Sequence, residues 1–558
     1  MTAADLLTGT GVVPGIAYAP AGWARKPPQV PVDTRIIAEE DRAAETERFR
    51  AAAETVAARF AARASAATGA ASEVLAATAT LAEDRGWIRT ATRQIGAGKP
   101  ATTATAEAIA KFVSQFEKIG GLMAERTTDL KDIRDRVIAE ILGLPEPGVP
   151  QPDQPIILLA PDLAPSDTAG LDPSKILGLV TQFGGPTSHT AIIARQLGIP
   201  CIVATPDLGL VEDGTAILVD GTTGTIRWGV AEAEARELVA ADANRRETVR
   251  AWKGPGRLAS GEHVQLLANV QDGAGARTAA GSPAEGVGLF RTELCFLTAQ
   301  TEPSVPEQAA IYREVLDAFP GKKVVIRTLD AGSDKPVPFA DHSHEENPAL
   351  GVRGVRLSFA REGLLEHQLD GIAEAAVGQQ GDKSSVWAMA PMIATVDEAR
   401  RFAAAVRSRG LLAGVMVEVP SVALLAEAFL NEVDFMSIGT NDLTQYTMAA
   451  DRMAPDLAYL TDPWQPAVLR LIASTAAAGL KLGKPVGVCG EAAADPVLAC
   501  VLVGLGVTSL SMASAAIPAV GVTLANATLE QCRQAAGAAL QATTAADAKA
   551  VALEVLGS

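Results

Sequence analysis

The chain has few of the features that mark secreted, disulfide-bonded or membrane-spanning proteins. Its five cysteines are scattered and odd in number among 558 residues, which favours free thiols in a reducing compartment over a disulfide framework. No apolar run reaches about 18 residues, and the most apolar part of the N-terminus is interrupted by Pro14 and Pro20. These absences predict a cytoplasmic protein without a signal peptide or a membrane insertion.

An excess of positive charge is also missing. The formal net charge is -17, which argues against nucleic acids and anionic membranes as partners. A surface of this sign suits an electropositive partner or serves only to keep the protein in solution. An anionic substrate would therefore have to be bound by a local cluster of basic residues.

The length of the chain and its changes of texture predict several domains. Residues 34–144 contain little proline and carry apolar residues at helical spacing in four runs, at about 36–66, 71–84, 101–118 and 121–142. Residues 1–33 and 145–229 have the pattern of short strands around one helix, so we expect one α/β domain with a helical bundle inserted into it. Residues 230–255 predict a charged linker helix.

Strand and helix patterns alternate throughout residues 256–558. Eight apolar strands are predicted, at 264–269, 286–290, 323–328, 386–391, 414–418, 434–438, 485–489 and 507–511. This alternation matches a (β/α)8 barrel of the TIM type, in which the chemistry lies at the carboxyl ends of the strands. The predicted class is therefore multidomain α/β.

A glycine turn leads into a helical pattern at residues 184–195, with His189 at the start of the helix. Free backbone N–H groups at a helix start favour an anion. Imidazole is both a nucleophile and a good leaving group, so His189 could accept a phosphoryl group and pass it on. The alternative is an ordinary helix start, capped by Ser188 or Thr187, with His189 merely exposed.

Charged side chains follow most of the predicted barrel strands. Glu418 and Asp442 are 24 residues apart, about one βα unit, so both carboxylates should meet at the barrel mouth. Two carboxylates and a substrate oxyanion suit Mg²⁺. The cations that could clamp a phosphate are Arg291, Arg327, Lys335, Arg353, Arg356 and Arg452. Taken singly, Arg353 and Arg356 are more typical of surface ion pairs.

The remaining reactive side chains have an ordinary interpretation beside any functional one. At the end of its predicted strand, Cys489 could give a proton to an enolate, or it could be a small buried hydrophobe. The other residues of these two types are expected to be buried (Cys201, Cys500 and Cys532) or solvent-exposed (His263, His342, His344 and His367).

Two long segments resemble the signatures of the phosphoenolpyruvate-utilising enzymes. Residues 184–195, GGPTSHTAIIAR, are similar to the phosphohistidine signature of that group, and residues 434–446, DFMSIGTNDLTQY, to its second signature. The order of parts resembles that of the Enzyme I family, the phosphoenolpyruvate–protein phosphotransferases of the bacterial sugar phosphotransferase system. The resemblance covers essentially the whole chain.

The resemblance implies a reaction at the barrel. Phosphoenolpyruvate and Mg²⁺ would bind there, with Glu418 and Asp442 as metal ligands. His189, oriented by Thr168, would take the phosphoryl group, and Cys489 would protonate the enolate to pyruvate. The residues implied to hold phosphate and carboxylate are Arg291, Arg327, Lys335, Asn441 and Arg452.

The same resemblance implies the protein partners. His189 would pass the phosphoryl group to a histidine of the carrier protein HPr, docked on the helical insertion of residues 34–144. The barrel domain would form a homodimer.

Two other functions would share parts of this pattern. A phosphoenolpyruvate synthase or pyruvate phosphate dikinase would carry both signatures, but it needs a nucleotide-binding domain, and residues 34–144 hold no Gly-rich phosphate loop. A regulator that binds HPr without catalysis would not need the catalytic groups.

Overall fold

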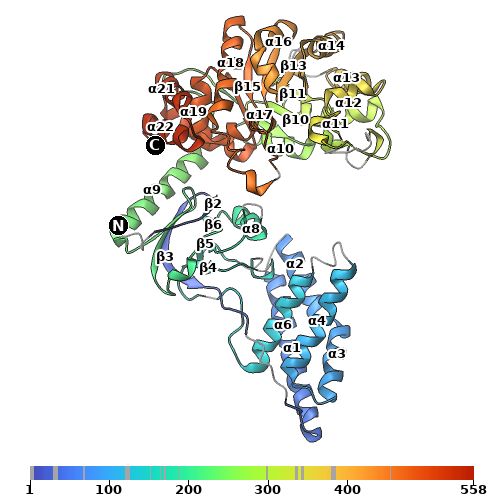
Figure 1. The fold of residues 1–558 in the computed structure, drawn as a ribbon, viewed down its shortest axis with the longest axis vertical. Helices are drawn as coiled ribbons and strands as arrows, with labels where there is room; N and C mark the ends of the chain where they lie inside the picture. The colour runs from blue at the N-terminus through green and yellow to red at the C-terminus, as the bar shows by residue number, and fades with distance from the viewer. Residues whose placement is uncertain are drawn as a thin grey trace. The chain divides into compact units, whose positions relative to one another are not determined.

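The computed structural model describes most of the chain, in the ranges 6–28, 35–66, 70–119, 126–150, 152–163, 165–168, 171–185, 188–296, 299–332, 337–340, 345–378, 385–452 and 454–557. The chain folds as two compact units, Met1–Arg245 and Arg246–Ser558. The first holds a mixed sheet and a helical bundle, and the second a closed barrel (Figure 1). The predicted class, multidomain α/β with a C-terminal TIM-type barrel, is confirmed.

An eight-stranded sheet forms the α/β part of the first unit, in the order β1-β8-β7-β3-β4-β5-β6-β2. Its strands are β1 Leu6–Thr8, β2 Thr10–Val13, β3 Ile16–Trp23, β4 Ile156–Ala160, β5 Ile176–Thr181, β6 Cys201–Val203, β7 Ala216–Asp220 and β8 Thr225–Trp228. β3 pairs in parallel with β4 and antiparallel with β7. The N-terminal strands are thus built into the sheet formed by the later ones.

β4 shows why this sheet is covered on both faces. All five of its residues are buried, and side chains alternate between faces along a strand. Leu158 packs in one hydrophobic cluster, whereas Ile157 and Leu159 pack in another. An unbroken apolar strand of this kind is typical of a sheet with a core on each side.

In the described residues, the insertion contains the helices α1 Arg42–Ala66, α2 Ala70–Ala82, α3 Arg85–Gly96, α4 Ala101–Ile119 and α6 Thr127–Leu142, with the 3-10 turn η2 Glu39–Asp41 before them. The helical spacing in the sequence did not predict α3. Asp84 caps this short helix by accepting hydrogen bonds from Gly86 and Trp87. Trp87, Ala91 and Ile95 then follow at a spacing of four and face the core.

A buried arginine joins this bundle to the α/β part. Arg136 of α6 is 1% exposed and lies 2.5 Å from Asp167 in the short helix α7, Pro165–Thr168. Its guanidinium also pairs with Asp132, at 2.9 Å, and with Glu146. Breaking a buried ion cluster leaves uncompensated charge, so these contacts fix α7 against α6.

The helix α9, Glu232–Ala251, follows the sheet. Its buried Asp242 accepts a hydrogen bond from the backbone N–H of Ile16, at 3.0 Å. The N-terminal part of α9 is therefore anchored to β3. Among the described residues, none of the helices is both long and apolar enough to cross a bilayer.

The second unit is a closed barrel of eight parallel strands, and all eight predicted strands are present. They are β9 Gln265–Val270, β10 Val287–Arg291, β11 Val324–Arg327, β12 Val386–Ala390, β13 Leu412–Val417, β14 Phe435–Ile438, β15 Val486–Val488 and β16 Ser509–Met512. Its helices are α10 Gly273–Ala280, α11 Val305–Ala318, α12 Val355–Ala360, α13 Leu364–Ala375, α14 Val396–Arg407, α15 Pro420–Leu424, α16 Ala426–Glu432, α17 Thr440–Met448, α18 Pro466–Leu482, α19 Pro496–Gly504, α20 Ile517–Asn526, α21 Leu529–Gln541 and α22 Ala545–Leu556.

Candidate active site

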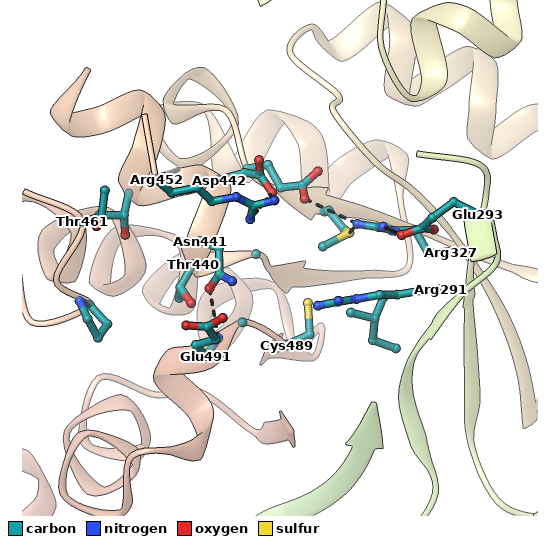
Figure 2. Close-up of a pocket in the computed structure, with 17 residues that line it drawn as sticks. Arg291, Glu293, Arg327, Thr440, Asn441, Asp442, Arg452, Thr461, Cys489 and Glu491 are labelled. Atoms are coloured by element: carbon teal, nitrogen blue, oxygen red, sulfur yellow. Dashed lines mark hydrogen bonds and ion pairs between the residues drawn. The ribbon is translucent and has the colours of Figure 1, made fainter. Parts of the chain in front are cut away.

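A cavity of about 450 Å³ lies at the carboxyl ends of the barrel strands (Figure 2). Arg291 ends β10, Arg327 ends β11 and Glu418 directly follows β13. Asn441 and Asp442 stand in the first turn of α17, and Cys489 follows β15. Seven predicted residues thus line one cavity: Arg291, Arg327, Glu418, Asn441, Asp442, Arg452 and Cys489.

The two predicted metal ligands are buried carboxylates. Glu418 is 1% exposed, and its Oε2 accepts a hydrogen bond from the backbone N–H of Met392 at 2.9 Å. Burial, followed by the nearby charges of Asp442 and Asp330, raises the pKa of Glu418 to about 7, against the opposing effect of Arg327. Oε1 of Glu418 and Oδ1 of Asp442 are buried without a hydrogen-bond donor.

Two arginines of the cavity, Arg327 and Arg452, lie close to carboxylates. Nη2 of Arg327 lies 2.5 Å from Glu293 and 3.2 Å from Asp330, and its Nη1 lies 3.8 Å from Glu418. Nη1 of Arg452 lies 3.8 Å from Asp442. Figure 2 shows Arg291 and Arg327 on one wall and Asp442 and Arg452 on the other.

Hydrogen-bonding capacity is left unused around this cavity. Buried polar side-chain atoms are almost always paired in native proteins, because an unpaired one costs about 1–3 kcal/mol. Ten such atoms lack a hydrogen-bond partner in the described chain, and six of them belong to residues that line this cavity. They are Arg291 Nε, Glu293 Oε2, Arg327 Nε, Glu418 Oε1, Thr440 Oγ1 and Asp442 Oδ1. The set contains both hydrogen-bond donors and acceptors, so it suits a ligand that carries both negative and positive charge.

The charges of the cavity lining fit an anion that arrives with a cation. Three arginines, Arg291, Arg327 and Arg452, face four carboxylates, Glu293, Glu418, Asp442 and Glu491. In the described residues, no group of three or more His, Cys, Asp or Glu side chains could hold a metal ion by itself. Mg²⁺ is usually bound through one or two carboxylates, and waters and substrate phosphates complete its coordination.

The thiol of Cys489 is buried beside these groups. It is 1% exposed, and its Sγ donates to the carbonyl oxygen of Ile438 at 3.6 Å. Burial raises the pKa of Cys489 to about 11, so the side chain stays a protonated thiol at neutral pH. Figure 2 shows its sulfur among the side chains that line the cavity, near Arg291.

Arg353 corrects the expectation of a surface ion pair. It is 2% exposed, and its guanidinium binds both oxygens of Asp330, at 3.0 and 3.1 Å. Its Nη2 also lies 3.4 Å from Oδ1 of Asp442. The residue is buried because it joins two carboxylates that face the same end of the barrel. Arg356 matches the expectation, with a partly exposed pair to Glu398 at 3.3 Å.

The phosphohistidine candidate lies in the first unit. His189 is the first residue of α8, His189–Leu197, and the Oγ of Ser188 caps that helix by accepting from Ala191 at 3.3 Å. Thr168 is buried at the end of α7, which packs against α8. Thr187, Lys335 and the side chain of His189 lie outside the described residues.

The other predicted cysteines and histidines lie where expected, as far as they are described. Cys201, Cys500 and Cys532 are buried. The exposed side chains of His263 and His367 contact Glu285 and Glu302, at 2.6 and 3.0 Å. His342 and His344 lie outside the described residues.

Sequence reasoning noted Glu293 and Asp330 as charged residues near strand ends but did not assign them as partners of the arginines. Glu293 lies two residues after β10 and Asp330 three residues after β11, at the strand ends where the chemistry of such barrels lies. Thr440 belongs to the segment 434–446, but nothing in its residue type indicates a hydroxyl left without a partner.

Comparison with known proteins agrees with this geometry. Three family models match: the PEP-binding domain of PEP-utilising enzymes at residues 245–529, their mobile domain at 152–224 and their N-terminal domain at 8–126. The phosphoenolpyruvate-protein phosphotransferase of Streptomyces coelicolor is 47% identical over 553 residues, 99% of each chain. The protein of the same name from Haloferax volcanii is 42% identical over 81% of each chain.

Among solved structures, the chain is similar to the NMR solution structure of Enzyme I (nEIt) protein. The identity is 28% with a TM-score of 0.39, over 43% of this chain and 99% of that one. With 47% identity over 99% of both chains, this chain belongs to the phosphoenolpyruvate-protein phosphotransferase family and is an enzyme of that family.

Proposed function

We propose that the chain transfers the phosphoryl group of phosphoenolpyruvate to its own His189 and then to a histidine of HPr, releasing pyruvate. The observation that carries the proposal is the set of six unpaired polar atoms converging on the barrel cavity. The phosphate and carboxylate oxygens of such a substrate can accept hydrogen bonds from the unpaired donors. A metal ion that accompanies the substrate can contact the unpaired carboxylate oxygens. Phosphoryl transfer depends mainly on positioning and charge neutralisation, which such a cavity supplies.

The arginines are proposed to hold the substrate. Arg291 and Arg327 each have a buried Nε without a partner, which can donate to phosphate oxygens. Arg452 lies on the opposite wall, where it can neutralise the second anionic group of the substrate. Asn441 accepts a hydrogen bond from the backbone N–H of Glu491 at 3.1 Å, so its amide group is held toward the cavity. Lys335 is proposed as a further phosphate contact on the resemblance alone.

Mg²⁺ is the proposed metal, held by Glu418 and Asp442. Each presents a buried oxygen without a donor, and hard carboxylate oxygens are the ligands that Mg²⁺ prefers. When bound, the ion would neutralise charge on the phosphate and on the enolate oxygen. Arg327 and Arg353 lie near the same two oxygens, at 3.8 Å from Glu418 and 3.4 Å from Asp442, and so partly neutralise the two carboxylates.

Cys489 is proposed to complete the reaction. When the P–O bond of phosphoenolpyruvate breaks and the phosphoryl group bonds to a His189 nitrogen, an enolate remains. The Sγ proton of Cys489 moves to the methylene carbon of that enolate and yields pyruvate. The raised pKa of the thiol supports this role, because the proton is present throughout the neutral range.

The remaining parts of the chain receive their roles from the family. We assign residues 1–33 and 145–229 to the phosphohistidine domain, 34–144 to HPr docking, 230–255 to the linker and 256–558 to the barrel. Thr168 is proposed to orient His189, which the packing of α7 on α8 supports. Because His189 and the cavity belong to different compact units, the two units must meet during each transfer.

The assembly and the location of the chain are proposed in the same way. We assign a homodimer formed through the barrel, supported by leucines that are 70%, 55% and 63% exposed on neighbouring helices: Leu424, Leu425 and Leu480. A cytoplasmic location is supported by the five cysteines, all of which are free thiols.

The test is transfer of label from phosphoenolpyruvate. With Mg²⁺ and without ATP, the protein should take up an acid-labile phosphoryl group that mass spectrometry places on His189, and then label HPr. His189→Ala should abolish uptake while leaving phosphoenolpyruvate binding in place. Uptake only with ATP would indicate a dikinase, and no uptake would indicate a regulator. Label on another residue would exclude His189 as the carrier.

A further inference from the structure

A second cavity, of about 580 Å³, opens at the amino ends of the barrel strands. Lys323 directly precedes β11, and Thr508 and Ser509 stand at the start of β16. The catalytic cavity lies at the opposite, carboxyl ends. The residues lining the second cavity are His263, Gln265, Gly321, Lys323, Ser385, Trp387, Pro485, Thr508 and Ser509. The mechanism uses none of them.

Lys323 is the charged group of this cavity. Its Nζ lies 3.8 Å from the ring centroid of Trp387 and 5.9 Å from that of Phe435. The lining contains no aspartate or glutamate, and within the described part of the chain Nζ forms no ion pair or hydrogen bond. Burial alone lowers the pKa of Lys323, to about 8.

The surrounding charged groups are already bound to others. His263 pairs with Glu285 at 2.6 Å. Lys322 donates to the carbonyl oxygen of Ala284 at 3.2 Å. Lys484 donates to two backbone carbonyl oxygens, those of Leu430 and Val433. The ammonium group of Lys323 is therefore opposed only by aromatic faces.

Small residues keep this end of the barrel open. A Cβ at Gly414 would lie 2.3 Å from the Phe435 ring, and one at Gly487 would lie 2.4 Å from Oγ of Ser509. Barrel interiors are usually filled by branched apolar side chains. Here glycine on β13 and β15 makes room for two tilted rings, 4.7 Å apart, and for the hydroxyl of Ser509.

We propose that this cavity binds a small oxyanion, a carboxylate or a phosphate, through Lys323. A cation over an aromatic ring is only weakly stabilised, and withdrawing an ammonium group from water costs more than this contact returns when no acceptor is supplied. An anion beside Nζ compensates the remaining charge. The Ser509 hydroxyl and the Gln265 amide line the same cavity and can donate to its oxygens.

The test uses the full-length protein with its lysines dimethylated by ¹³C-formaldehyde, a change that keeps the positive charge. In the ¹³C NMR spectrum, the Lys323 resonance is identified by its absence from the spectrum of the Lys323→Arg variant. The resonance of its neighbour Lys322 is identified in the same way with Lys322→Arg. Each is followed through a pH titration in sodium chloride, in sodium phosphate and in sodium acetate at equal ionic strength. Lys322 is the matched control, because it lies next in sequence but outside the cavity lining.

In chloride, Lys323 should titrate near pH 8, where its pKa lies. Phosphate or acetate should shift its resonance saturably and raise its midpoint, because a bound anion favours the ammonium form. A response to phosphate alone or to acetate alone supports the site and identifies its ligand. The site does not exist if neither anion moves the Lys323 resonance beyond the change seen for Lys322. The outcome does not depend on phosphoryl transfer, so this inference and the proposed function can fail separately.

Discussion

Several residues at the barrel mouth are charged and buried, with polar atoms that lack hydrogen-bond partners. A stable apolar core avoids such groups, whereas a binding site for a charged ligand needs them. Glu418 is a nearly inaccessible carboxylate with one oxygen lacking a donor, and its pKa is raised to about 7. Arg327 carries its charge in the same place because Asp330, Glu293 and Glu418 outweigh the effect of burial. These buried groups have too few hydrogen-bond or ionic partners, and one charged ligand would provide partners for several of them.

Replacing Glu418 by glutamine should separate ligand binding from folding. We expect labelling of His189 to slow by about 10²-fold or more at every Mg²⁺ concentration, because the metal loses an anionic ligand. The melting temperature of the metal-free protein should stay level or rise, since a neutral amide avoids a buried charge. Glu427→Gln, at an exposed carboxylate paired with Lys481, should leave labelling unchanged. Unchanged labelling in Glu418→Gln would remove this residue from the metal site.

Arg353→Met tests the buried arginine that sequence reasoning had assigned to the surface. Its loss deprives Asp330 of two hydrogen bonds and Asp442 of a cation at 3.4 Å. Removing one partner of a buried ion pair costs about 3–5 kcal/mol, so urea unfolding should show that loss. Arg356→Met removes a partly exposed pair and should cost below about 1 kcal/mol. Equal costs for the two variants would contradict the structural role of Arg353.

At the scale of elements, the site depends on how closely the ends of strands and the starts of helices approach. Gly490 follows Cys489 after β15, and a Cβ there would lie 2.0 Å from Oγ1 of Thr440 and 2.6 Å from its backbone nitrogen. Thr440 begins α17, which carries Asn441 and Asp442. The absence of a side chain at Gly490 therefore allows the Cys489 thiol to lie close to the turn that carries Asp442, the proposed metal ligand.

Gly490→Ala should push these two elements apart. We expect transfer to fall by about 10-fold or more, because displacement of reacting groups by roughly 1 Å is costly. Overpacking should destabilise the protein by about 1–3 kcal/mol. The control is Gly537→Ala in α21, where a Cβ meets nothing within 4 Å, and it should stabilise by up to about 1 kcal/mol. Normal transfer by Gly490→Ala would show that the junction tolerates this change.

At the scale of the whole molecule, the division into Met1–Arg245 and Arg246–Ser558 puts His189, the proposed phosphoryl carrier, and the proposed substrate cavity in different units. Each has its own cores, the bundle and the sheet clusters in the first and the barrel cluster in the second. Units with separate cores can fold on their own.

Separate expression of the two units should divide the reaction. Calorimetry should show that residues 246–558 bind phosphoenolpyruvate with Mg²⁺ as the full chain does, yet this fragment should take up no label. Residues 1–245 should exchange the phosphoryl group with phosphorylated HPr but take none from phosphoenolpyruvate. Label on the barrel fragment would contradict His189 as the acceptor.

The sequence by itself determined the class of fold, the eight barrel strands and seven of the residues that line the barrel cavity. It could do so because strand ends of a parallel barrel converge, and because the segments 184–195 and 434–446 are long and specific. Helix α3 was not predicted, because it is too short for a long periodic pattern. It is stabilised by its cap and by three buried residues.

Only the tertiary structure decided which charges are buried and which atoms lack partners. Arg353 and Arg356 stand three residues apart in the sequence, yet one joins two buried carboxylates and the other reaches a partly exposed one. Likewise, neighbouring Lys322 and Lys323 differ only in what surrounds them. Burial and pairing depend on residues distant in the chain, so they arise only when those residues are brought together.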